Sequence, residues 1–156
     1  MTEIRASTQS NPLRAVGFWL ALVMALLQAI YAVQAFIDPS GFATYRGTPL
    51  MTDGDTDWVQ IYASRTLFVA LIVGLLLARM DLATLKWVSL LGVVMPFSDA
   101  FLAHQAGASF AVFSRHVATV IYLLVTFVAL LVWCKRNRPD ISFRSLDSAL
   151  PAPPRQ

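Results

Sequence analysis

Four long runs of mainly apolar residues constrain this 156-residue chain more than any other feature. A helix that crosses a bilayer needs about 20 such residues, because each adds about 1.5 Å toward a hydrocarbon core about 30 Å thick. Lipid gives backbone N–H and C=O groups no water partner, and four segments are too few to close a barrel, so each run is predicted to be a helix. We therefore predict an all-α membrane protein, a four-helix transmembrane bundle at residues 14–136, with helices at 18–37, 59–78, 82–103 and 112–133.

The composition supports a bilayer as the natural solvent. Hydrophobic residues make up 57% of the chain and charged residues 13%, about half the charged share of soluble domains. A soluble domain of this size could not cover so much apolar surface. Most basic residues flank the apolar runs, which suits lipid headgroups, so nucleic acid is not an expected partner. Tryptophans, which favour the wet interface, stand near the expected helix ends: Trp19, Trp58, Trp87 and Trp133.

The distribution of lysine and arginine predicts the orientation, because cytoplasmic segments carry an excess of both. The side that holds both termini has nine basic residues, whereas the opposite side has three. Those three are Arg46, Arg65 and Arg115. We therefore expect both termini in the cytoplasm, and a multi-pass protein of the cell membrane, of the bacterial inner-membrane type.

The segments outside the helices are expected to be irregular. Residues 1–13 and the polar, proline-rich tail 137–156 are predicted to be disordered, the tail in the cytoplasm. The external connection 38–57 is punctuated by proline and glycine, which favour ordered turns or a mobile loop over a helix. We expect its aromatic residues to lay this loop over the outer helix ends.

Ionisable residues gather in the outer half of the predicted bundle. Asp99 is the deepest acid and Arg65 the nearest base, and a charge within a span costs about 2.5–3.5 kcal/mol on insertion scales. Such a charge faces the bundle and usually has a partner, so we expect an Asp99–Arg65 ion pair. Pro96, three residues before Asp99, lacks a backbone donor and is expected to kink the third helix.

The same region holds the candidate functional residues. Arg65, Asp99, His104, Arg115 and His116 are expected to line a small polar pocket that opens outward under the loop. Such a pocket suits a lipophilic small molecule with one polar end, such as a quinone, a sterol-like lipid or a hydrophobic acid. Residues 99 and 104 differ by about 140° around a helix, so no metal site is predicted. The sequence identifies no cofactor.

Two alternative functions stay open. The first is a small membrane enzyme, an isomerase or an oxidoreductase, in which Asp99 or His116 moves a proton. The second is a non-catalytic accessory subunit whose charges only hold helices together. Asp99 and His116 are therefore only candidates for catalysis, and enzymatic activity is undecided. The lipid bilayer is an expected partner, and a homo-oligomer or a larger membrane complex stays open.

Four stretches of the sequence resemble one known family. They are "GTPL", "YASRTLFVALIVGLLLAR", "VMPFSDAFLAHQAGA" and "SRHVATVIYLLV". Together they are similar to the small four-helix integral membrane proteins grouped as domain of unknown function 4267, over roughly residues 16–133. The resemblance implies the same fold, but it implies no activity. Its best-matching residues are Arg65, Pro96, Asp99, Ala100 and His116.

Overall fold

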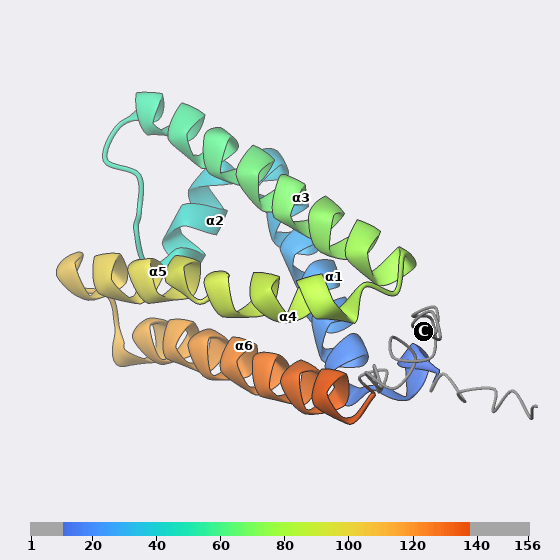
Figure 1. The fold of residues 1–156 in the computed structure, drawn as a ribbon. Coiled ribbons are helices and arrows are strands. Elements are labelled where there is room, and N and C mark those ends of the chain that lie inside the picture. The colour runs from blue at the N-terminus through green and yellow to red at the C-terminus, as the bar shows by residue number, and fades with distance from the viewer. Residues whose placement is uncertain (1–10, 138–156) are drawn as a thin grey trace, which may run out of the picture.

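The computed structural model describes residues 11–137, and its regular elements are all helical. Two of them are short 3-10 turns, η1 (Pro12–Arg14) and η2 (Asp53–Asp55). The segments 1–10 and 138–156, which belong to the tails expected to be disordered, lie outside the described residues. The α-helices, labelled in Figure 1, are α1 (Val16–Ile37), α2 (Pro39–Arg46), α3 (Thr56–Ala78), α4 (Leu82–Leu91), α5 (Val94–Gln105) and α6 (Phe110–Arg136).

The predicted four-helix membrane bundle is confirmed. Four helical segments are long and apolar enough to cross a membrane, and each coincides with one of the expected spans to within a few residues. The protein is therefore a multi-pass, all-helical membrane protein. The four segments are Val16–Ile37, Thr56–Ala78, Leu82–Gln105 and Phe110–Arg136.

The third span consists of two helices rather than one, because the chain breaks between α4 and α5 at Gly92 and Val93. Pro96 has no N–H to donate to the carbonyl of Gly92, four residues earlier. The Met95 N–H bonds to that carbonyl instead, at 3.2 Å, in a tighter turn. The interruption predicted from Pro96 therefore exists, and it lies about one turn before the proline.

The connection between the first two spans contains α2, so the prediction that this connection has no helix was wrong. The Asp38 side chain caps α2 by accepting a hydrogen bond from the Gly41 N–H, at 2.9 Å. Pro39 stands in the first turn, where a residue needs no backbone N–H because the helix offers it no carbonyl partner there. Gly47 ends the helix in the left-handed region, with φ 85°.

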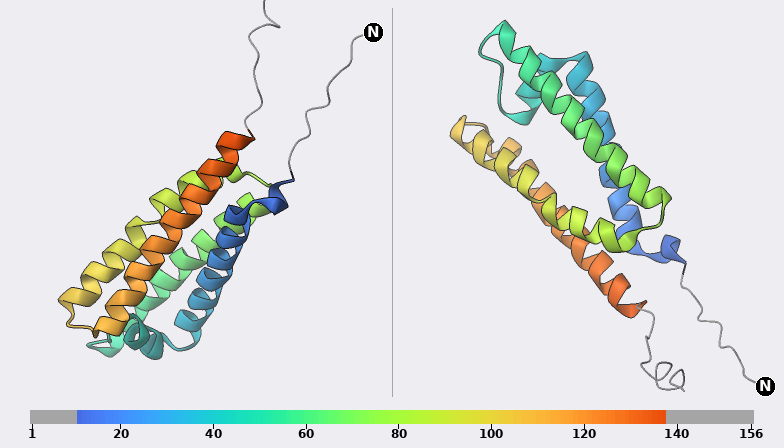
Figure 2. Two further views of the ribbon diagram at one scale, coloured as in Figure 1. Left: turned by 90° about the horizontal axis from the view of Figure 1, so that it is seen from below. Right: turned by 45° about the horizontal axis from the view of Figure 1, so that its top comes forward.

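The helices form two pairs that lie close at one end and diverge toward the other (Figure 1, Figure 2). In one pair α1 packs along α3, and in the other α4 and α5 pack along α6. The pairs meet where α1 begins and α6 ends, which we call the closed end. At the opposite end, which we call the loop end, α2 and the chain after it lie between the diverging pairs (Figure 1).

The main apolar core lies at the closed end. Gly17 of α1 lets α6 approach closely, because an added Cβ would lie 2.6 Å from Cγ of Leu130, a fully buried side chain. The Tyr122 hydroxyl donates a hydrogen bond from α6 to the Leu20 carbonyl of α1, at 2.7 Å. The buried members of this core are Ala15, Phe18, Ala21, Ala25, Val73, Leu77, Leu82, Leu85 and Leu130.

Candidate functional site

Arg46 occupies the last turn of α2, and its neighbour Gly47 determines where it lies. Gly47 has a positive φ and lies against the beginning of α6, where an added Cβ would be 2.7 Å from Cγ1 of Val112. A residue with a side chain would be strained at this backbone angle and would clash with α6. The close approach brings Arg46 within reach of both α5 and α6.

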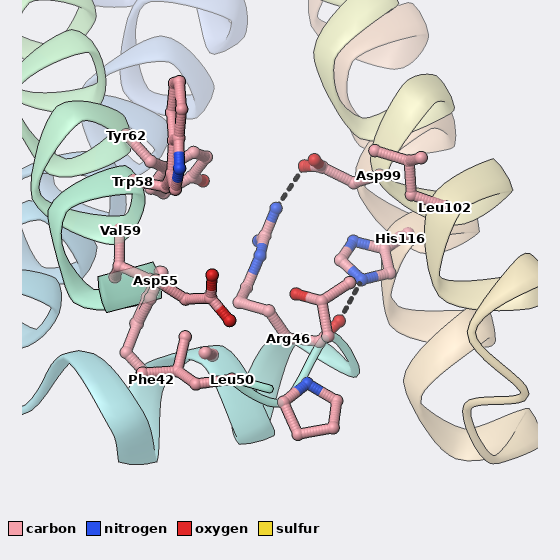
Figure 3. Close-up of a pocket in the computed structure, with 13 residues that line it drawn as sticks. Phe42, Arg46, Leu50, Asp55, Trp58, Val59, Tyr62, Asp99, Leu102 and His116 are labelled. Atoms are coloured by element: carbon pink, nitrogen blue, oxygen red, sulfur yellow. Dashed lines mark hydrogen bonds and ion pairs between the residues drawn. The ribbon is translucent and has the colours of Figure 1, made fainter. Parts of the chain in front are cut away.

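The Arg46 guanidinium forms an ion pair with the Asp99 carboxylate of α5, through Nη2 and Oδ2 (Figure 3). The side chains are only 18% and 27% exposed, respectively. The expected Asp99–Arg65 pair was wrong, because within residues 11–137 Asp99 pairs with Arg46 instead. Arg65 lies on the exposed side of α3, whereas Ala63 and Thr66 are the buried positions beside it.

His116 of α6 contacts the same arginine through its main chain. The imidazole Nε2 lies 3.2 Å from the carbonyl oxygen of Arg46, and the residue is 5% exposed. A carbonyl can only accept, so Nε2 carries a proton and donates it. In a neutral imidazole Nδ1 is then an acceptor. Arg46 therefore links α2 to α5 by its side chain and to α6 by its carbonyl.

Aromatic rings from three helices surround the guanidinium. The Arg46 Cζ lies 5.9 Å from the ring centre of Tyr31 on α1, 6.0 Å from that of Phe42 on α2, and 5.6 Å from that of Tyr62 on α3. Ring faces attract a cation at such distances. These contacts and the ion pair hold the arginine charge at a place where little water reaches it.

A pocket of about 380 Å³ opens beside this cluster, between α2, α3, α5 and α6 (Figure 3). Volumes of this size hold small ligands. Its lining combines charged and polar side chains with a wall that is otherwise mainly apolar. We call it the loop pocket, and it is lined by Phe42, Ala43, Arg46, Thr48, Pro49, Leu50, Asp55, Trp58, Val59, Tyr62, Asp99, Leu102 and His116.

Asp55 is the second acid of the loop pocket, and the loop itself holds its carboxylate. Oδ2 accepts hydrogen bonds from the backbone N–H groups of Thr52, at 2.9 Å, and Met51, at 2.8 Å. These bonds, the one from Thr52 above all, lower the pKa of Asp55 below its ordinary value. Asp55 is therefore ionised at neutral pH, so two carboxylates and one guanidinium line the pocket.

The structure brings together two of the five residues expected to line a pocket, Asp99 and His116. Arg65 lies outside the loop pocket, in a neighbouring cleft between α3 and α5 that Asp99 also borders. Sequence reasoning missed Arg46, the residue that connects Asp99 to His116. The capping residues of α2 were the available signal, since they predict a short helix that ends at Arg46.

The other two expected residues lie apart from the loop pocket. The Arg115 guanidinium carbon lies 4.7 Å from the ring centre of Tyr45, on the last turn of α2. His104 is exposed at the end of α5, with its ring centre 5.9 Å from that of Phe113. Both residues contact aromatic rings, and neither faces the Arg46–Asp99 pair in the way that His116 does.

The chemistry available in the loop pocket is hydrogen bonding and proton transfer. The N–H groups of Arg46 that do not bond to Asp99 are donors, whereas Asp99 Oδ1 and His116 Nδ1 are acceptors. Within residues 11–137 no three His, Cys, Asp or Glu side chains lie close enough to hold a metal ion. The site therefore offers both a donor and acceptors to one polar group of a ligand.

Comparison with known protein families identifies the family of the chain. Residues 25–131 match the family model described as Domain of unknown function (DUF4267). The match covers more than half of the chain, so the protein belongs to this family, as the resemblance predicted. No curated protein and no solved structure matches the chain.

Proposed function

We propose that this member of the DUF4267 family binds an uncharged lipophilic small molecule in the loop pocket, with the polar head of the ligand at Arg46, Asp99 and His116. The observation that carries the proposal is the joining, in one pocket, of a half-buried ion pair, a histidine acceptor and an apolar wall. In the orientation expected from the basic residues, this pocket faces away from the cytoplasm.

The wall of the pocket supports a ligand that is mainly apolar. Leu50 comes from the loop, Val59 from α3 and Leu102 from α5, so apolar groups face the pocket from three directions. Ligand sites of this kind bind by apolar contact and orient the ligand with a few polar groups. The polar groups here lie together around Arg46 (Figure 3).

The charges support an uncharged head. Arg46 already pairs with Asp99, and Asp55 adds a second carboxylate to the lining. An anionic head would therefore meet an excess of negative charge, and desolvation would add to that cost. A hydroxyl or carbonyl head can bond to the unused donors and acceptors without separating the ion pair.

Native mass spectrometry of gently purified protein tests this proposal. We expect wild-type protein to retain a discrete small molecule that the Asp99→Asn protein loses. Asp57→Asn is the matched control, because Asp57 is an exposed acid in the first turn of α3 and does not line the pocket. Extraction and fragmentation of the retained molecule then give its chemical class.

Two results would overturn the proposal. If wild-type and Asp99→Asn proteins are equally bare and equally stable, the Arg46–Asp99 pair only links helices, as in the accessory-subunit alternative. If both variants lose the molecule to the same extent, the loss follows from surface charge rather than from the pocket.

A second candidate function is acid–base catalysis on such a ligand, by an isomerase or an oxidoreductase. It is favoured by the contact of Asp99 and His116 with one shared arginine, because both could reach the same bound group. Once the ligand class is known, turnover of that class should fall by about 100-fold or more in His116→Gln protein. Binding without turnover in the wild type would leave only the binding function.

A further inference from the structure

A second cavity, of about 300 Å³, lies in the middle of the bundle between α1, α3, α4 and α6. Its lining is almost entirely apolar, and two of its three polar side chains are occupied locally. The Ser89 hydroxyl donates to the Leu85 carbonyl at 3.0 Å, and the Thr126 hydroxyl donates to the Tyr122 carbonyl at 2.9 Å. We call this the central cavity.

Gln28 is the third polar side chain of the central cavity, and within residues 11–137 its carboxamide makes no hydrogen bond. Gln28 is half-buried, and a carboxamide without a partner is unfavourable where it faces hydrocarbon. Gln28 lies one helical turn from Tyr31, whose ring faces Arg46. The cavity therefore presents one unused polar group at the side nearer to the loop pocket.

The cleft that contains Arg65 borders both the loop pocket and the central cavity. This cleft of about 640 Å³ runs between α3 and α5, and it shares Tyr62 and Asp99 with the loop pocket. It also shares Val69 and Met95 with the central cavity. The three spaces therefore share walls between the ion pair and the middle of the bundle.

The open side of this cleft faces lipid. Its border includes Phe68 of α3 and Val94 of α5, which are 64% and 65% exposed, in segments that are apolar enough to span a membrane. The two helices that border it, α3 and α5, belong to the two diverging pairs (Figure 1). A molecule dissolved in the bilayer could enter here without crossing water.

We infer that the ligand is a chain-bearing lipid that enters from the bilayer between α3 and α5, places its polar head at Arg46 and Asp99, and extends its chain into the central cavity. The inference rests on the proposed function and names its substrate class: an uncharged single-headed lipid, such as a long-chain or isoprenoid alcohol. The ligand chain then fills the apolar central cavity. Protein interiors are close-packed, so a large empty cavity is unfavourable.

Site-specific photolabelling in nanodiscs of phosphatidylcholine tests the inference. The probe is a 16-carbon alcohol with a diazirine at the chain end, and a second probe is a six-carbon alcohol with the diazirine beside the hydroxyl. We expect the long probe to label peptides that contain Met24 or Leu123, which line the central cavity and not the cleft. The short probe should label peptides that line the loop pocket.

Filling the cavity supplies the decisive variant. Ala70→Phe places a ring in the central cavity and should lower chain-end labelling there by roughly tenfold, because overpacking a filled site is costly. The matched control is Ala118→Phe, the same change at an exposed position of α6. Should Ala70→Phe fail to fold, Leu123→Trp fills the same cavity from α6.

The outcomes separate the inference from the proposed function. Short-probe labelling of the loop pocket without long-probe labelling of the central cavity would overturn the chain site and leave the proposed function standing. Absence of both labels would overturn both. Central labelling that persists unchanged in Asp99→Asn protein would show that ordinary bilayer chains enter the cavity independently of the head site, which also overturns the inference.

Discussion

The two ends of this bundle are held together by different kinds of contact. At the closed end, buried alanines, leucines and a glycine bring the two helix pairs into direct apolar contact. At the loop end the pairs have separated, and Arg46 joins them through one ion pair and one hydrogen bond. The main apolar core and the polar cluster are therefore separated along the helix axes, because the end that opens a pocket contributes little to that core.

The largest effect is expected from a cavity at the closed end. Leu130→Ala removes a fully buried side chain from the α1–α6 contact and should cost about 2–3 kcal/mol of unfolding free energy, mainly as lost packing. Steric-trapping measurements in bicelles would give this value. Leu102→Ala, at the loop pocket, should cost less than about 1 kcal/mol because Leu102 is 53% exposed. If the two substitutions lowered the free energy of unfolding equally, the proposed difference in packing between the two ends would be wrong.

A smaller loss is expected where α2 meets α6. Gly47→Ala should destabilise the loop end by about 1–2 kcal/mol, because the residue has a positive φ and its Cβ would clash with Val112. Amide exchange should accelerate in α2 while the closed end keeps its protection. Gly74→Ala is the control, since nothing lies within 4 Å of a Cβ at this ordinary helical position. If amide exchange became faster at both ends of the bundle alike, the two ends would not be independent in stability.

Breaking the ion pair from one side should cost about 1–2 kcal/mol, because the remaining charge is half-buried without its partner. We expect this loss in Arg46→Met protein, again measured by steric trapping. The double variant Arg46→Met/Asp99→Leu should recover much of the loss, because no unpaired charge remains. If the double variant recovers stability but loses the bound ligand, the Arg46–Asp99 pair serves ligand binding rather than stability. Failure of the double variant to recover would mean that the pair stabilises the loop end.

The smallest effect is a pH dependence of the loop. The Asp55 pKa is lowered by hydrogen bonds from Thr52 and Met51, so these bonds stabilise the folded loop fully above the ordinary pKa of 3.8. The stabilisation is lost as the pH falls through the lowered value. The protection of the Met51 and Thr52 amides, relative to the exchange rate of an unstructured chain at the same pH, should therefore fall below about pH 4. Asp55→Asn should remove this transition, whereas Asp57→Asn should keep it.

The fold was largely predictable from the sequence because a bilayer allows few structures. Apolar length alone predicts the spans, and the missing N–H of Pro96 predicts an interruption of the third one. The gathering of charges at one end was also visible from the positions of Asp99 and His116. What apolar length could not predict is how far the helix pairs diverge, because that depends on side-chain packing between segments far apart in sequence.

The partner of Asp99 was predicted wrongly for a physical reason. Depth along the helix favoured Arg65, but Arg65 faces away from the buried side of α3. Arg46 reaches Asp99 because α2 folds inward between the pairs, and that required a helix in a loop with proline and glycine. The caps of α2, Asp38 at its start and Gly47 at its end, carried this information.

The length of α6 determines how this helix meets the two membrane interfaces. Its 27 residues extend about 40 Å, whereas a hydrocarbon core is about 30 Å thick, so its two ends reach the headgroup regions. Basic side chains stand at both ends, with Arg115 near the start and Lys135 and Arg136 in the last turn. One helix therefore anchors the bundle at both membrane surfaces.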